Sequence, residues 1–359
     1  MSSELERRLE GLLTEAPEPD RGAAEEALHR ALRALQPTAP TRRGLRTAVL
    51  VFAATAVLLA IAAGSLAAAG ALHVSFGTKT HSPLTTSELS LPKGANGVAA
   101  IVDGRLSVVI KGGFRLQGLT ASAVALSPHA LYVAAGIGNS LVAMAPDGRR
   151  AWSHPAGGEV VAIAWAPDGF RIAYVVRHGR RFALRAIYGN GTHESLIDRS
   201  VRPVRPSWRA DSLAFAYVGA GGKAIVYDLG HTSRAVVTSD SPVTHVAYAT
   251  AGRKLAVATQ DSVQVVPHGL GVASCSSVGI GWLGRKVAYA CETPFLTTVF
   301  PGYAVPVPGE ARVIDANGRR VAMALLTRSR VLLVAGTSSH LQTIQRLPPN
   351  ARVTDLQLG

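Results

Sequence analysis

A pair of short apolar strands joined by a Pro-Asp-Gly turn constrains the fold of this chain more than any other feature. The pair is clearest at Val160–Val176, with the sequence VVAIAWAPDGFRIAYVV. Ile163 and Trp165 alternate with alanines before the turn, and Ile172 and Tyr174 alternate with smaller residues after it. Alternation every two residues is typical of β-strands, and Pro-Asp-Gly favours a turn. The segment therefore predicts a β-hairpin.

The same pair of strands recurs six times along the chain. Each copy has a large residue near the end of its first strand, and these anchors are Leu126, Trp165, Trp208, Tyr248, Trp282 and Leu325. The second strands begin at Leu131, Ile172, Leu213, Leu255, Val287 and Leu332. Successive anchors are 39, 43, 40, 34 and 43 residues apart. A period near 40 residues, with room for four short strands, predicts a β-propeller.

The two ends of this region supply one more unit. Val98–Val102, Arg105–Ile110 and Phe114–Gly118 are three predicted strands with no first strand before them, whereas Val353–Leu358 is a first strand with nothing after it. A blade built from both ends closes the ring and removes its free edges. We expect an all-β, seven-bladed β-propeller over residues 97–359, with six blades as the alternative.

The turn at Ala166–Gly169, followed by Ile-Ala-Tyr, resembles the TolB-type and WD-repeat-like propellers of bacteria. The resemblance covers residues 97–359 and is weakest at 292–320. It implies a binding platform rather than an enzyme. Leu141–Trp152 also resembles a quinoprotein-type repeat, but it occurs convincingly once, so we predict no quinone or other cofactor.

The N-terminal part of the chain predicts a membrane anchor. The pattern of residues 1–36 predicts two short amphipathic helices, and residues 1–46 have equal numbers of basic and acidic residues. Thr47–Leu72 has no charged residue and is long enough to cross a bilayer. Arginines precede it, so the positive-inside rule predicts a cytoplasmic N-terminus and an extracytoplasmic propeller. A cleaved signal peptide ending near Ala69–Ala71 is the alternative.

Residues 73–96 are rich in Ser and Thr and predict a stalk between this single-pass anchor and the propeller. The layout resembles bacterial transmembrane anti-sigma regulators, which implies signalling through the cytoplasmic tail. Many of those proteins carry a His/Cys zinc motif before the membrane. This tail has only His29 and no cysteine, so it departs from that pattern.

A run of arginines is the strongest binding signal. The whole chain has a formal net charge of +14, and residues 171–209 hold nine arginines against two acidic residues. The predicted loops place seven basic residues on one face of the ring: Arg177, His178, Arg180, Arg181, Arg199, Arg202 and Arg205. Clustered arginines suit phosphate or carboxylate groups, as on lipid headgroups, cell-envelope polymers or an acidic protein. An ordinary solvated surface is the alternative, and an extracytoplasmic location argues against nucleic acid.

Motifs for catalysis and metal binding are missing from the sequence. There is no G-x-S-x-G, H-E-x-x-H or C-x-x-C, and the glycines of Gly279–Gly284 fit G-x-G-x-x-G only by letter, because strands flank them. We predict no catalytic residue and no metal. The rival interpretation is a hydrolase or quinoprotein-like enzyme that uses the axial pocket, because propeller enzymes assemble sites from distant blades.

Cys275 and Cys291 are the two cysteines of the chain. They lie at equal distances from residue 283, near the predicted turn of one hairpin, so an antiparallel pairing would bring them together. An oxidising outer compartment favours a bond between them. We predict a Cys275–Cys291 disulfide, with two unpaired thiols as the alternative.

Overall fold

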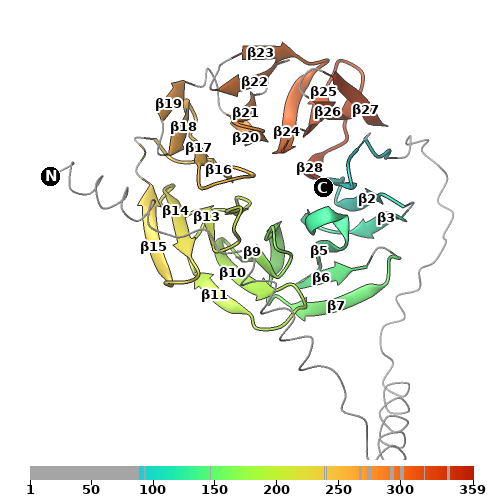
Figure 1. Ribbon diagram of the computed structural model, residues 1–359. Helices are drawn as coiled ribbons and strands as arrows, with labels where there is room; N and C mark the ends of the chain where they lie inside the picture. Colours follow the sequence, from blue (N-terminus) through green and yellow to red (C-terminus); the bar gives the residue numbers. More distant parts are fainter. Residues whose placement is uncertain are drawn as a thin grey trace, which may run out of the picture. The chain divides into compact units, whose positions relative to one another are not determined.

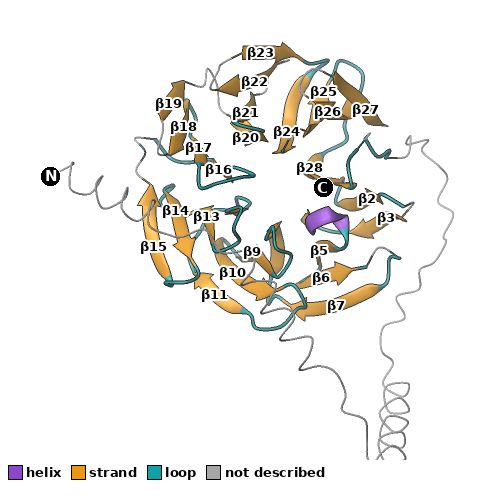
Figure 2. Ribbon diagram, viewed as in Figure 1, coloured by secondary structure: helices purple, strands orange, loops and turns teal. Residues whose placement is uncertain are grey.

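Twenty-eight strands and one short 3-10 helix make up the described part of the chain (Figure 2). The structure is a computed structural model, and it describes residues 89–92, 94–112, 114–145, 147–237, 239, 241–266, 269–272, 277–291, 295–299, 303–318, 320–337 and 340–359. The strands form seven four-stranded sheets within these residues, and all pairing is antiparallel.

Four sheets are built from the strands between residues 97 and 237, and the first of them also includes a strand near the end of the chain. One sheet has the order β28 (Val353–Leu358), β1 (Gly97–Val102), β2 (Arg105–Ile110), β3 (Phe114–Thr120). The next contains β4 (Val124–Leu126), the 3-10 helix η1 (Pro128–Ala130), β5 (Val133–Ile137), β6 (Ser140–Met144) and β7 (Arg150–Pro155). The third contains β8 (Glu159–Trp165), β9 (Arg171–His178), β10 (Arg181–Tyr188) and β11 (Ser195–Asp198). The fourth contains β12 (Ser207–Trp208), β13 (Ala214–Val218), β14 (Ala224–Asp228) and β15 (Ser233–Val237).

Three more sheets continue the same order to residue 347. The fifth contains β16 (His245–Tyr248), β17 (Leu255–Ala258), β18 (Ser262–Val266) and β19 (Gly269–Val272). The sixth contains β20 (Ser277–Leu283), β21 (Lys286–Cys291), β22 (Phe295–Val299) and β23 (Tyr303–Pro306). The seventh contains β24 (Glu310–Asn317), β25 (Arg320–Leu326), β26 (Val331–Thr337) and β27 (His340–Leu347).

The sheets stand around a circle, with the C-terminus beside β28 at its inner side (Figure 1). The fold is therefore an all-β propeller. The predicted sheet made from both ends of the chain is confirmed, because β28 pairs with β1, with Val98 opposite Leu358 and Ile101 opposite Asp355. Seven sheets are present in the described residues, where the sequence predicted seven with six as the alternative.

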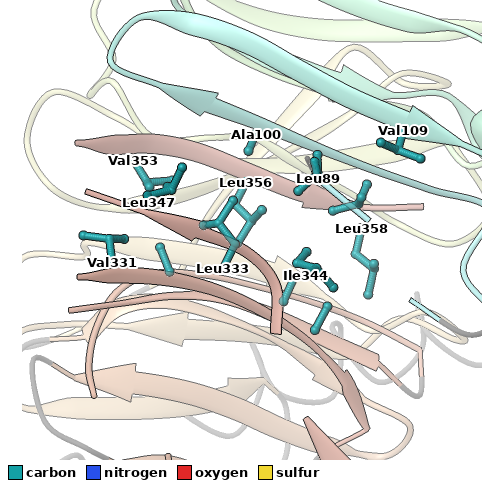
Figure 3. Packing of buried hydrophobic residues seen from close by; sticks show 14 of the residues in the cluster. Leu89, Ala100, Val109, Val331, Leu333, Ile344, Leu347, Val353, Leu356 and Leu358 are labelled. Atoms are coloured by element: carbon teal, nitrogen blue, oxygen red, sulfur yellow. The ribbon is translucent and has the colours of Figure 1, made fainter. Parts of the chain in front are cut away.

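Seven clusters of buried apolar residues hold the ring together, each lying between two neighbouring sheets of the described chain. The cluster that closes the ring joins the sheet of β24–β27 to β1 and β28 (Figure 3). Leu333, Ile344 and Leu356 are almost completely buried there. Burial of each such side chain contributes about 1.5–3 kcal/mol, so every sheet depends on both neighbours.

Tryptophans near the ends of first strands tie neighbouring sheets together. Trp208 Nε1 in β12 donates to the carbonyl of Ala164 in β8 at 3.0 Å. Trp282 Nε1 in β20 donates to the carbonyl of Ala247 in β16 at 2.9 Å. Each bond satisfies a backbone acceptor on the inner edge of the preceding sheet, which has no strand beyond it to pair with.

The glycines of the G-x-G-x-x-G match serve packing. Gly279 and Gly281 lie in β20, and β21 follows after a short turn, so a strand stands where a dinucleotide site needs a helix. A Cβ at Gly281 would lie 2.5 Å from the carbonyl oxygen of Ala316 in β24, and one at Gly279 would lie 2.7 Å from Ile314 Cγ2. These glycines therefore let β20 approach β24 closely.

The prediction for the last repeat was wrong by one strand. Leu325, predicted as a first-strand anchor, lies in β25, the second strand of its sheet, and Leu332 lies in β26, the third. The first strand is β24, with the sequence EARVIDAN. β24 has no Trp or Tyr, whereas β25 and β26 are both apolar, so the pattern selected the wrong pair.

The ring also begins earlier than residue 97. Leu89, placed in the predicted stalk, is buried in the closing cluster. The backbone N–H of Ser90 donates to the carbonyl of Ile344 in β27 at 2.9 Å, and its Oγ donates to the same oxygen at 3.1 Å. The last residues of the predicted stalk thus pack on the propeller.

The predicted tail at 1–46, the predicted span at 47–72 and residues 73–88 lie outside the described residues, and they stay predictions. No helix among the described residues combines the length and the apolar character that a membrane span needs. Cys275 also lies outside them, so the disulfide is untested. The backbone of Cys291 is opposite Ser277 in the ladder of β20 and β21, two residues from the predicted partner.

Candidate functional site

The ring has two faces, because successive strands of a sheet run in opposite directions. The turns from second to third strands and the connections between sheets open on one face, which we call the arginine face. The turns from first to second strands open on the other face. The chain enters the ring there, since Asn96 N–H donates to the carbonyl of Gly359 at 3.1 Å, and we call it the entry face.

Four of the seven predicted basic residues surround the turn between β9 and β10 on the arginine face. Arg177, His178, Arg180 and Arg181 are all exposed. His178 and Arg181 are opposite each other at the end of the ladder. Arg177 forms an ion pair with Glu159 at the start of β8, so its charge is partly neutralised.

Arg199 and Arg202 lie in the connection from β11 to β12, next to that turn. Between them, the N–H of Val201 donates to the carbonyl of Phe182 in β10 at 3.1 Å. The predicted proximity of the two loops is therefore present in the structure. Arg199 is exposed, whereas Arg202 is half-buried, with Nη1 3.3 Å from the carbonyl oxygen of Val243.

Three cations of this group face solvent with no acidic partner. Within the residues that the structure describes, no carboxylate forms an ion pair with Arg180, Arg181 or Arg199. We name these three residues the arginine cluster. Their guanidinium groups keep their donors for planar oxyanions such as phosphate and carboxylate.

Arg205 does not belong to the exposed group, which corrects its predicted place. It lies just before β12, and its guanidinium points into the central channel, where it pairs with Asp355 of β28 and, at 3.5 Å, with Asp315 of β24. Two sheets separate the β12–β15 sheet from each of these partners' sheets around the ring. Arg205 therefore spans the channel from one side to the other.

The channel has a volume of about 910 Å³ and is lined by the first strands of the sheets. Asp355 Oδ2 also accepts from the N–H of Val124 at 2.9 Å, and Asp315 Oδ2 accepts from the N–H of Leu358 at 2.9 Å. The two carboxylates thus link β28 to β4 and β24 to β28. They satisfy backbone donors on inner edges that have no strand to pair with.

Burial and charge shift the pKa values of the groups in the channel. Burial raises the pKa of Asp315, and Arg205 and the N–H of Leu358 partly offset this effect. Burial alone would lower the pKa of Arg205, but Asp355 and Asp315 raise it. Burial, helped by the positive charge of Arg205, lowers the pKa of His245 to about 4, and its Nδ1 has no hydrogen-bond partner.

The sequence offered one signal for this cluster. Asp315 directly follows Ile314 in β24, and Asp355 directly precedes Leu356 in β28, so both are acidic residues in first strands that line the channel, and a buried acidic residue needs a partner. Nothing in the sequence connects them to Arg205, which is 110 residues from one and 150 from the other. Among the described residues, no group of three metal-binding side chains occurs.

No protein-family model matches the chain, and no curated protein matches it in sequence. Solved structures do resemble it, and 1216 of their chains match. The WD40 repeats of RRP9 align with a TM-score of 0.51 at 12% identity, covering 66% of this chain and 82% of that chain. The β-propeller domain of Cps50 (Swd1) from Myceliophteria thermophila aligns with a TM-score of 0.50 at 13% identity, covering 64% and 86%. The chain has a WD40-type β-propeller fold.

Proposed function

We propose that this protein is a membrane-anchored, extracytoplasmic binding or sensing module whose propeller holds a partner and performs no chemistry. The observation that carries the proposal is the arginine cluster, Arg180, Arg181 and Arg199, exposed on one face of a closed ring. Within the WD40-type fold, the turn at Ala166–Gly169 favours the TolB-type propellers of bacteria.

The chemistry of the arginine cluster suggests the partner. Exposed guanidinium groups bind phosphates and carboxylates through paired N–H donors. We expect an acidic protein or an anionic polymer of the cell envelope. A location outside the cytoplasm disfavours nucleic acid.

The channel supports binding more than catalysis. Both of its aspartates already form ion pairs with Arg205 and accept a hydrogen bond from a backbone N–H, so neither resembles a free general acid or base. His245 is neutral near pH 7, and its Nδ1 has no partner to orient it as a base. The rival hydrolase or quinoprotein-like enzyme gains no support from this arrangement.

The arginine cluster is tested with the full chain in detergent and a poly(glycerol phosphate) probe. Replacing Arg180 and Arg181 with Gln should weaken binding at least tenfold at low salt, and less at high salt because salt screens exposed charges. The matched control replaces Arg149 and Arg150 with Gln. These two adjacent exposed arginines lie where the turn from β6 enters β7, away from the arginine face. Equal loss in the two variants, or no binding by the parent, would contradict the proposal.

The membrane topology rests on Thr47–Leu72 and on Arg42, Arg43 and Arg46 before it. Fusions after Gly359 test it: alkaline phosphatase should be active and a cytoplasm-dependent fluorescent protein should stay dark. A fluorescent fusion without phosphatase activity would overturn the orientation.

The cytoplasmic tail, residues 1–46, is the proposed route for a signal, in the manner of a transmembrane anti-sigma regulator. Its two predicted amphipathic helices present leucine and alanine stripes for a protein partner. Capture from lysate with the full chain, compared with a chain that lacks residues 1–46, should recover a sigma-like protein only with the former. Identical captures would remove the signalling role and leave the binding module.

A further inference from the structure

A patch of exposed apolar side chains lies on the entry face, away from the arginine cluster. Phe170 is 73% exposed, Leu131 57% and Leu213 51%, although all three sit at turns between first and second strands of consecutive sheets. Tyr132 and Tyr188 are exposed beside them. We name these five residues the entry-face patch.

Hydrogen bonds hold the turns that carry the patch. The N–H of Asp168 donates to Ser212 Oγ at 2.9 Å, which fastens the turn of Phe170 to the turn of Leu213. On the other side, the N–H of Gly189 donates to the carbonyl of Phe170 at 2.7 Å. The patch is therefore fixed in shape before any partner arrives, and binding would require little ordering.

An aromatic contact holds the turn that carries Leu131 and Tyr132. The ring of Tyr132 stacks on the ring of Trp165, with the ring centroids 6.4 Å apart. Two further exposed apolar residues, Leu196 and Val236, lie on the outer strands β11 and β15 rather than at these turns. Single exposed apolar residues are ordinary, whereas several on neighbouring turns of one face mark an interaction surface.

The path of the chain indicates what covers the patch. Gly97 lies against the turn that precedes Leu131, since a Cβ there would be 2.7 Å from Ala130 Cβ. The segment that follows the predicted anchor first contacts the ring at Leu89 and Ser90, beside β27, and then runs to the entry face at Gly97. Sixteen residues separate Leu72 from Leu89, which span about 55 Å at full extension. A tether of this length would allow the entry face to reach the bilayer.

The side chains suit the interfacial region of a bilayer. Phe and Leu at turn tips enter the acyl boundary, and tyrosines remain at headgroup level with their hydroxyls in water. Arg171, beside Phe170, pairs with Asp168 at 3.8 Å and donates to the carbonyl of Ser212 at 3.2 Å, so it helps to hold the turn of Phe170 against the turn of Leu213.

We propose that the entry-face patch rests on the lipid bilayer that holds the anchor, with Phe170, Leu131 and Leu213 inserted and the arginine face turned away from the membrane. This inference rests on the proposed membrane anchoring. It adds an orientation: the arginine cluster is presented to partners beyond the membrane surface.

The test uses the full chain reconstituted in phosphatidylcholine–phosphatidylglycerol vesicles with brominated acyl chains. Bromine quenches tryptophan fluorescence only at contact distance, so Phe170→Trp reports insertion, after subtraction of the parent's four native tryptophans. The matched control is Leu196→Trp, which probes an exposed apolar position on an outer strand. We expect at least threefold stronger quenching of the added tryptophan at position 170 than at position 196.

Extraction with alkaline carbonate is measured on the same vesicles. Release of the chain would overturn the membrane anchor and the inference with it. An embedded chain in which positions 170 and 196 are quenched equally would overturn the inference alone. Cross-linking between copies through position 170 would also overturn it, because a second copy would then cover the patch. The variant Phe170→Ser should keep the parent's melting temperature and lose only its contact with lipid.

Discussion

Two interfaces between sheets show that this ring is held together in two different ways. The interface between the β8–β11 and β12–β15 sheets contains Trp208, Phe215 and Tyr217, with the rings of Trp208 and Phe215 4.8 Å apart. Tyr217 also donates its hydroxyl to Asp198 Oδ2 at 2.8 Å. The buried cluster of the closing interface contains only Ala, Val, Leu and Ile. One interface has large, specific contacts, and the other has many small ones.

The two interfaces also differ in how the chain forms them. A connection of eight residues joins β11 to β12, so the β8–β11 and β12–β15 sheets are neighbours along the chain. The closing interface packs the β24–β27 sheet against a sheet built from both ends of the ring, in which the ladder between β28 and β1 sets the register. Its side chains pack as small aliphatic groups, whereas the first interface adds aromatic contacts and a side-chain hydrogen bond.

Arg205 connects the two regions across the channel. It precedes Trp208 in the chain and ends at Asp355 and Asp315, beside the closing ladder.

Removing β28 should have the largest effect. Deletion of residues 351–359 takes away Leu356 and Leu358 from the closing cluster and exposes the edge of β1. Burial of Val353, Leu356 and Leu358 contributes about 1.5–3 kcal/mol each. This loss is comparable with the net stability of a typical domain, roughly 5–15 kcal/mol, so calorimetry should show no cooperative transition. A truncated chain that melts cooperatively at the parent's temperature would contradict closure by both chain ends.

Replacing Arg205 with Met should have the next largest effect. The variant keeps the volume but leaves Asp315 and Asp355 without their cation, and breaking a partly buried pair from one side costs about 3–5 kcal/mol. Urea unfolding at pH 7 measures this free energy. Arg180→Met, at an exposed position, is the matched control and should change the unfolding free energy by less than about 0.5 kcal/mol.

The same variant has a characteristic pH dependence. Burial already raises the pKa of Asp315, and loss of Arg205 should raise it further. A carboxyl whose pKa is higher in the folded state destabilises that state once the pH exceeds the unfolded value near 4. The deficit of Arg205→Met should therefore shrink as the pH falls from 7 towards 4. A deficit that is constant with pH would assign it to packing.

The contrast between the two interfaces also explains which parts of the fold the sequence could predict. Trp165, Trp208, Tyr248 and Trp282 mark first strands correctly, because each of these four strands carries one large aromatic residue at or near its end. Near the closing interface, no strand carries a Trp or Tyr to mark it, and Leu325 was assigned to the wrong strand of its sheet. Alternation identifies a strand but not its position in a sheet.

The two parts of the candidate site also differ in how far the sequence could predict them. The arginine cluster lies in loops whose proximity follows from the order of strands alone, so its residues were predictable. The Arg205–Asp315–Asp355 cluster depends on which side chains meet across the channel, and that depends on the tilt and the number of sheets. Period and composition do not encode these quantities.

Protonation of His245 should have an intermediate effect. Its pKa is about 4 in the folded state, below the ordinary 6.5, because burial and Arg205 disfavour the charged form. Above pH 6.5 the ring is neutral in both the folded and the unfolded chain. As the pH falls from 6.5 to 4, the unfolded chain takes up the proton more readily, so the folded state loses up to about 3 kcal/mol of stability. His245→Gln should flatten this part of the stability profile in urea titrations. Identical slopes in parent and variant would contradict the pKa shift.

The smallest effects come from single groups at the two interfaces, and they test whether the aromatic interface and the closing interface are held together differently. Tyr217→Phe removes one hydroxyl, leaving Asp198 with the N–H of Ser200 and with Arg234, so we expect a loss of about 1–2 kcal/mol.

Ile344→Val removes one methylene from the closing cluster and should cost about 0.5–1.5 kcal/mol. Combining Tyr217→Phe with Asp198→Asn should cost less than the sum of the two single changes, because the hydroxyl and the carboxylate act as a pair. Ile344→Val should add to either change without coupling, since the two interfaces share no contact. Strong coupling between Ile344→Val and Tyr217→Phe in urea unfolding would mean that the ring responds as one unit, with no distinction between its interfaces.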